Sequence, residues 1–137
     1  MEVIAIKIPI RSEKKAVKQF LEELFNLLSS EDFDIDNDLI IVRSSKEDIE
    51  HSTPYTMNDL EYDASDVVER LKELVLAEYV ETLIDNEDDT PPLLFVFGKI
   101  INSKTVYIKL KIKGEPRRTV LCLSFHYALH EMDYPYR

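Results

Sequence analysis

The sequence is poor in the residues that define several large classes of protein. It has one cysteine, two glycines, six prolines and no tryptophan among its 137 residues. A single thiol, Cys122, excludes a disulfide scaffold, and the low glycine and proline content excludes collagen and low-complexity disorder. No apolar run approaches the roughly 18 residues of a membrane-spanning helix. An acidic second residue, with no small-residue cleavage site near the N-terminus, further predicts a cytoplasmic protein without a membrane partner.

The composition predicts one compact domain over residues 1–137. Hydrophobic residues make up 45% of the chain and charged residues 32%. A single domain commonly has about 100 to 200 residues, which is enough to bury one core. Within this domain, residues 1–55 predict a strand-helix-strand element, and residues 56–137 predict helices followed by a β-meander. The chain has no glycine-rich phosphate loop and no G-x-S-x-G elbow.

The net charge of −10 hides a strong asymmetry along the chain. Residues 1–60 carry 7 basic and 13 acidic side chains, residues 61–97 carry 2 and 11, and residues 98–137 carry 8 and 3. Phosphate-binding domains are usually basic, and only the last of these segments has that character. If the protein handles RNA, we expect residues 98–137 to do so, while the acidic part faces away or faces a basic partner.

Hydrophobic spacing predicts the N-terminal elements. The β-branched run Val3–Pro9 predicts a strand, and apolar residues three and four apart between Ser12 and Leu28 predict a helix. Leu39–Val42 predicts a second strand, which follows an acidic connector. The polar stretch Ser44–Tyr62 contains a Thr-Pro pair that favours extended backbone, so it predicts a loop.

A second helical region and three strands are predicted beyond this loop. Asp63 or Ser65 caps a helix whose apolar spacing continues to Ile84, with a break near Ala77. Three apolar or alternating runs joined by short turns then predict an antiparallel meander: Leu93–Ile101, Val106–Lys113 and Thr119–Tyr127. The predicted fold class is therefore α+β, with helices packed on one face of an antiparallel sheet.

The first strand has two open roles in this fold. It extends the sheet by pairing with the edge of the meander, which protects that edge from association with other chains. Alternatively, it mediates a homodimer.

Alternation along the meander separates an apolar face from a polar one. In the middle strand the apolar face carries Val106, Ile108, Leu110 and Ile112. The opposite face of that strand carries Tyr107, Lys109, Lys111 and Lys113. In the last strand, alternation groups Leu121 and Leu123 with Phe125, and Cys122 and Ser124 with His126. If both apolar faces lie on the helices, the polar face gathers Tyr107, Lys109, Lys111, Ser124 and His126, with Lys99 nearby. Such a surface can hold a phosphate and move a proton.

These residues also have simpler interpretations. A row of lysines on a sheet is commonly a solvated surface that resists aggregation. A histidine on an apolar strand, such as His126, is commonly a hydrogen-bonded structural residue.

Metal binding finds little support in the spacing of ligands. Acidic residues alternate from Asp32 to Asp38 as in a calcium loop, but the glycine is missing and the twelfth position counted from Asp34 is Ser45. We therefore expect a solvated connector there. A nuclease-type site combining Asp36 and Asp38 with Lys109 has no supporting spacing, and the three histidines are scattered. No metal or other cofactor is predicted.

Several short motifs resemble the toxin family of the motility quorum-sensing regulator (MqsR) type. They are Phe97-Gly98-Lys99, Val106–Leu110, Leu121–Ala128 and Tyr134-Pro135-Tyr136. Upstream, Asp66–Leu74 followed by Glu78-Tyr79 resembles the paired helices that precede the sheet in that family. The resemblance covers roughly residues 56–137 and leaves the N-terminal element outside it.

This resemblance implies a RelE-like fold and a metal-independent endoribonuclease that cuts messenger RNA, with a cognate antitoxin as partner. In such enzymes the 2′-hydroxyl attacks the adjacent phosphate, while the protein supplies a base, an acid and cations. The resemblance carries over to Tyr107 and His126. Together with the shared polar face it predicts His126, Tyr107 and Lys109 as catalytic residues. The predicted phosphate-binding residues are Lys99, Lys111 and Ser124. His126 stands where better-known members carry lysine, and its unperturbed pKa of about 6.5 suits proton transfer. A further lysine of those members falls near Val80 or Glu81, where this chain has no basic residue.

A different class of function stays open beside the ribonuclease. The same lysine-rich face is also suited to a non-catalytic interaction module that binds a partner protein or an acidic ligand, with residues 1–55 as the specificity element. The acidic character of residues 1–97 favours this second interpretation, because it repels both RNA and an acidic antitoxin.

Overall fold

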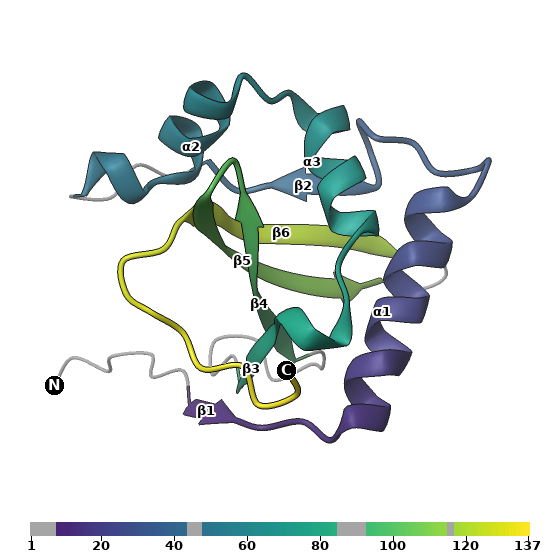
Figure 1. Ribbon diagram of the computed structural model, residues 1–137. Coiled ribbons are helices and arrows are strands. Elements are labelled where there is room, and N and C mark those ends of the chain that lie inside the picture. The colour runs from purple at the N-terminus through teal and green to yellow at the C-terminus, as the bar shows by residue number, and fades with distance from the viewer. Residues whose placement is uncertain (1–7, 44–47, 85–92, 115–116) are drawn as a thin grey trace, which may run out of the picture.

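The structure is a computed structural model that describes residues 8–43, 48–84, 93–114 and 117–137. It contains three α-helices, two single 3₁₀ turns and a sheet (Figure 1). The helices are α1 (Lys14–Ser29), α2 (Thr53–Leu60) and α3 (Ala64–Lys72). The 3₁₀ turns are η1 (Ile49–His51) and η2 (Leu76–Glu78). The strands are β1 (Ile8–Ile10), β2 (Leu39–Ile41), β3 (Tyr79–Ile84), β4 (Leu94–Ile101), β5 (Lys104–Lys113) and β6 (Thr119–Tyr127).

The six strands form one mixed sheet in the order β1-β3-β4-β5-β6-β2. Every neighbouring pair is antiparallel except β2 with β6, which is parallel. The α+β class and the C-terminal meander are therefore confirmed. The N-terminal element contributes both outer strands, so it belongs to the same sheet as the meander.

The three helices cover one face of this sheet. Their apolar side chains, such as Leu24 of α1 and Leu71 of α3, join a buried cluster with the inward residues of β4, β5 and β6. Phe20 of α1 stacks on Phe95 of β4 with 4.1 Å between ring centroids. Within the described residues, no helix is long and apolar enough to cross a membrane. The opposite face of the sheet carries Tyr107 beside a small apolar cluster of Leu83, Leu94 and Val96.

Residues 53–60 form helix α2, so the loop prediction for Ser44–Tyr62 is wrong over this stretch. Ser52 caps the helix through its Oγ atom, which accepts a hydrogen bond from Tyr55 N at 3.3 Å. The hydroxyls of Thr53 and Thr56 accept hydrogen bonds from the backbone N–H groups of Phe125 and Tyr127 at 3.1 and 3.0 Å. Thr53 and Thr56 thus face inward and bind the backbone of β6. Because these inward positions are polar, the segment lacks the apolar spacing that would have predicted a helix.

Residues 79–84 form strand β3, so the predicted continuation of the second helix to Ile84 is wrong. The strand pairs with β1 on one side and β4 on the other, with a bulge between Tyr79 and Glu81. Its apolar spacing fits either structure, but its tyrosine, valine, threonine and isoleucine content favours a strand. Tyr79 and Thr82 are both fully buried against the helix-covered core.

The first strand begins at Ile8, and the rest of the predicted run Val3–Pro9 lies outside the described residues. β1 pairs with β3 rather than with the meander itself, and Ile8 lies opposite Ile84. The other outer position is filled by β2, which pairs with β6. A homodimer through the N-terminal strand remains a prediction.

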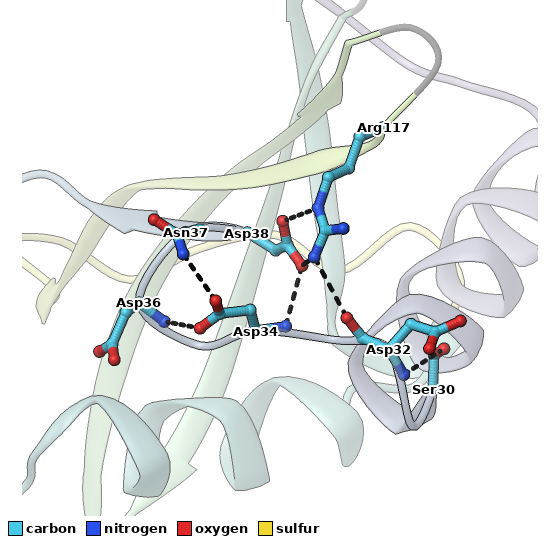
Figure 2. A network of polar contacts seen from close by, with 7 residues as sticks. All are labelled: Ser30, Asp32, Asp34, Asp36, Asn37, Asp38 and Arg117. Carbon is cyan, nitrogen blue, oxygen red and sulfur yellow. Dashed lines mark hydrogen bonds and ion pairs between the residues drawn. The ribbon is translucent and has the colours of Figure 1, made fainter.

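The acidic connector between α1 and β2 is bound by an arginine that lies just before the neighbouring strand β6. Arg117 donates from Nε and Nη2 to the two carboxylate oxygens of Asp38, each at 2.6 Å (Figure 2). Asp38 also accepts from the backbone N–H of Asp34 at 2.8 Å, and Arg117 donates to the carbonyl of Asp32. Because Asp38 is only 5% exposed, the expectation of a solvated connector is wrong for this residue.

Removing this arginine is expected to destabilise the fold in a pH-dependent way. The hydrogen bonds from Arg117, followed by the one from Asp34, hold the pKa of Asp38 below its ordinary value of 3.8. The stabilisation is therefore present above that value and is lost as pH falls through the lower pKa of the folded state. We expect Arg117→Ala to lower the urea midpoint strongly at about pH 7, because it leaves a buried carboxylate without its cation, and less at a pH below the ordinary value of 3.8.

Lys72→Ala provides the control, since Lys72 forms a partly exposed ion pair with Glu69 at 3.5 Å. It is expected to change the urea midpoint little at either pH. An equal loss for Arg117→Ala at both pH values would contradict the assigned role of Asp38.

Candidate active site

A bulge in β6 decides which of its side chains share a face with β5. Lys109 pairs with Ser124, but Leu110 pairs with Cys122, so Leu123 is an extra residue between them. From Cys122 toward the start of β6, each side chain therefore points to the opposite face from the one that simple alternation predicts. Cys122 is fully buried in the helix-covered core, and burial raises the pKa of its thiol to about 12.

The faces predicted for the first half of β6 are therefore wrong. Leu121 lies opposite Lys111, and Leu123 packs against the same apolar cluster as Tyr107 on the polar side. Phe125 lies on the helix side as predicted.

Tyr107 and His126 form a stacked pair on the polar side of the sheet. They lie directly opposite each other in the β5–β6 register, and their ring centroids are 5.1 Å apart at an interplanar angle of 14°. In the next register pair, Lys109 lies opposite Ser124. The two pairs therefore place a phenol, an imidazole, an ammonium and a hydroxyl side by side on two adjacent strands.

These four residues line one cavity of about 280 Å³. The remaining wall comes from residues that follow β6, including Leu129, His130 and Met132. This segment leaves the end of β6 and runs along the sheet toward β3 and β1 (yellow in Figure 1). The structure thus brings together four of the six predicted site residues: Tyr107, Lys109, Ser124 and His126.

The backbone fixes the proton on the imidazole of His126. Its Nδ1 atom lies 2.9 Å from the carbonyl oxygen of Tyr127. A carbonyl only accepts hydrogen bonds, so Nδ1 must carry the proton and donate it. In the neutral ring the lone pair then lies on Nε2. Such a fixed tautomer orients the ring for proton transfer at Nε2.

The phenol of Tyr107 is held in its neutral form. Burial raises its pKa to about 12, and the negative charge of Glu81 on β3 contributes to the same shift. Tyr107 therefore keeps its O–H donor throughout the neutral and moderately alkaline range. It can donate a hydrogen bond to an oxyanion but does not act as a base at neutral pH.

Lys99 lies on the opposite side of the sheet, so its predicted position near Tyr107 and His126 is wrong. It pairs in register with Val106, whose side chain is buried under the helices. Its Nζ atom lies 3.3 Å from Glu78 Oε2 and 3.7 Å from Glu73 Oε1. Lys99 therefore joins β4 to η2 and the end of α3 and does not reach the cavity.

Lys111 is on the predicted face but is not among the residues that line the cavity. It lies opposite Leu121, and only 3% of it is exposed. A side chain so deeply covered is not presented to a phosphate in this structure.

Two residues of the site, His130 and Gly98, were not predicted from the sequence as parts of the cavity. His130 lines this cavity and two neighbouring hollows, although its position after the last strand gave no indication of this. Gly98 lies opposite Tyr107, and a Cβ atom there would collide with the Tyr134 hydroxyl and the Met132 methyl group. The glycine thus lets the C-terminal segment lie close to β4 and complete the cavity wall.

The groups present are suited to proton transfer and anion binding. Within the parts of the chain that the structure describes, no three His, Cys, Asp or Glu residues are grouped so as to hold a metal ion. The neighbouring hollow shares Tyr107 with the cavity and is also lined by Glu81, Glu131 and Asp133. Arg11 is a single cation on the same lining, so this side of the site has a net acidic charge. Comparisons of the chain with protein-family models, with curated proteins and with solved structures find no match, so the function rests on the chemistry of this cavity.

Proposed function

We propose that this protein is a metal-independent endoribonuclease that cleaves RNA through attack of a 2′-hydroxyl on the adjacent phosphate. The observation that carries the proposal is the stacked Tyr107–His126 pair in one cavity with Lys109 and Ser124. The resemblance of residues 56–137 to MqsR-type toxins supports the same function. It further suggests messenger RNA as the substrate and a cognate antitoxin as the protein partner.

Each group has a role that its chemistry permits. His126 Nε2 accepts the proton of the 2′-hydroxyl, and the 2′-oxygen forms a bond to phosphorus. The bond from phosphorus to the 5′-oxygen then breaks, and that oxygen takes a proton from solvent or from a protonated side chain of the site. Lys109 and the Tyr107 hydroxyl stabilise the charge on the non-bridging oxygens, and Ser124 offers a further hydroxyl donor. The products are a 2′,3′-cyclic phosphate and a 5′-hydroxyl end.

A labelled RNA oligonucleotide tests this chemistry. Purified protein is expected to cleave it with EDTA present, and to leave a 2′,3′-cyclic phosphate at the new end. The same oligonucleotide with one 2′-deoxynucleotide at the cleavage position should resist cleavage there, because the nucleophile is missing. Induced expression is expected to arrest growth and deplete transcripts.

The alternative function is a non-catalytic module that binds a partner through the same face. The acidic residues beside the cavity favour it, because Glu81 and Glu131 repel an RNA backbone. Harmless expression, together with intact RNA after incubation with the purified protein, would support the module and contradict the ribonuclease.

A further inference from the structure

A second and larger hollow of about 470 Å³ lies beside the candidate active site. It is formed where α2 meets the start of β5 and the residues after β6. Binding sites for small molecules commonly have volumes of about 300 to 1,000 Å³, so this hollow is large enough for a nucleoside. The proposed reaction leaves it without a role.

The hollow adjoins the active-site cavity at the segment that follows β6. Ala128, Leu129 and His130 line both of them. A polynucleotide whose phosphate lies beside His126 would therefore place a neighbouring base within reach of this hollow.

Two tyrosine rings and a lysine line the hollow. Tyr55 is 37% exposed and lies edge-on to Tyr127, with 6.5 Å between ring centroids at 73°. Lys104 Nζ lies 4.6 Å from the centroid of the Tyr127 ring, and the Tyr127 hydroxyl donates to Asp59 at 2.5 Å. Tyr127 is thereby fixed from both sides, while Tyr55 presents an accessible ring on which a base can stack.

Two carboxylates line the same hollow and define what it accepts. Glu50 and Glu131 are both exposed and come from η1 and from the segment after β6. Carboxylates repel a phosphate group, but they accept hydrogen bonds from the exocyclic amino group of a base, as in recognition of cytosine N4. Adenine, cytosine and guanine carry such a group, whereas uracil carries only carbonyl oxygens and one ring N–H.

We propose that this hollow binds a nucleobase bearing an exocyclic amino group, next to the phosphate cleaved at His126. This inference rests on the proposed ribonuclease function and assigns part of its substrate recognition. Tyr55 stacks on the base, and Glu50 and Glu131 accept hydrogen bonds from its amino group.

Binding of free nucleosides tests the hollow independently of cleavage. Adenosine, cytidine and uridine are titrated into isotope-labelled protein, and the ring resonances of Tyr55 and His51 are followed by NMR. Adenosine and cytidine are expected to shift these resonances, with at least about tenfold weaker binding by uridine. Tyr55→Ala is expected to weaken binding by about tenfold or more, while Tyr55→Phe keeps it, because stacking needs the ring and not the hydroxyl.

Phe25→Ala is the matched control, because Phe25 is an exposed aromatic residue on α1 and is 51% exposed. It should leave binding unchanged. The double variant Glu50→Gln/Glu131→Gln should reduce the preference for adenosine and cytidine over uridine. Equal binding of all three nucleosides, or binding that Tyr55→Ala leaves unchanged, would overturn the proposal.

Cleavage assays separate this inference from the proposed function. If RNA is cleaved and Tyr55→Ala changes neither the rate nor the base beside the cut, the base site is wrong and the ribonuclease stands. If RNA is never cleaved but adenosine and cytidine bind at Tyr55, the hollow is supported and the ribonuclease is not.

Discussion

Replacing His126 with alanine is expected to lower the rate of RNA cleavage by about 10²- to 10⁴-fold, the usual scale for a general acid–base group. The tautomer set by the Tyr127 carbonyl leaves Nε2 to accept the proton, and alanine has no group that can do so. The measurement is the single-turnover rate on a labelled RNA oligonucleotide. Circular dichroism and the thermal midpoint check that the variant is folded.

Two further variants separate proton transfer from structure. In His126→Asn the side-chain amide can still donate to the Tyr127 carbonyl but has no basic nitrogen, so we expect a loss as large as that in His126→Ala. Tyr107→Phe keeps the stacked ring and removes one hydrogen-bond donor, so we expect a loss of about tenfold. Because the pKa of Tyr107 is raised to about 12, Tyr107→Phe should lower the rate without changing its pH profile below about pH 10. Full activity in His126→Ala and Tyr107→Phe would refute the site.

Replacing Tyr79 with alanine is expected to lower the free energy of unfolding by about 3 to 5 kcal/mol, as for other large buried aromatic residues. Tyr79 is fully buried, and its ring lies 5.7 Å from Tyr136 and 6.0 Å from Phe97 between centroids. Its hydroxyl also lies 2.7 Å from the Thr82 hydroxyl and accepts from Ser12 N at 2.9 Å. Urea unfolding measures the change, which is a large part of the roughly 5 to 15 kcal/mol that stabilises a domain.

Two controls locate this effect. Tyr79→Phe keeps the packing and removes only the hydroxyl, so its cost should be about 1 kcal/mol. Phe25→Ala removes an exposed aromatic ring and should change stability by less than about 0.5 kcal/mol. A cost for Tyr79→Ala no greater than that for Phe25→Ala would show that Tyr79 does not hold β3 to the core.

The sequence predicted the elements whose apolar pattern permits only one structure. Spacings of three and four over 16 residues specify α1 (Lys14–Ser29), and strict alternation specifies β5 (Lys104–Lys113) with Tyr107 and Lys109 on its polar side. By contrast, Tyr79–Ile84 is short and apolar, and its pattern fits a helix or a strand. Its neighbours β1 and β4 determine the outcome, and these contacts are long-range.

The errors in the candidate site have two physical causes. The run Leu94-Phe95-Val96-Phe97 is buried on both faces of the sheet, so alternation could not show on which face the next lysine, Lys99, would lie. In β6 the extra residue Leu123 reverses the alternation, and nothing in the local sequence marks this bulge. Tyr107, Lys109, Ser124 and His126 were grouped correctly because all four lie on the same side of that bulge.

The order of the strands has a consequence for the synthesis of the chain. β1 and β2 are made first, but their partners β3 and β6 follow much later, since Ile8 pairs with Ile84 and Leu39 pairs with Val120. Neither β1 nor β2 can form its native pairing until its partner strand has been synthesised. Pairings between residues so distant in the sequence also form slowly. The cavity needs β6 and the residues after it, so a nascent chain that ends before His126 has no cleavage site. The ribonuclease proposed here would therefore acquire its cavity only after His126 and the residues that follow β6 have been synthesised.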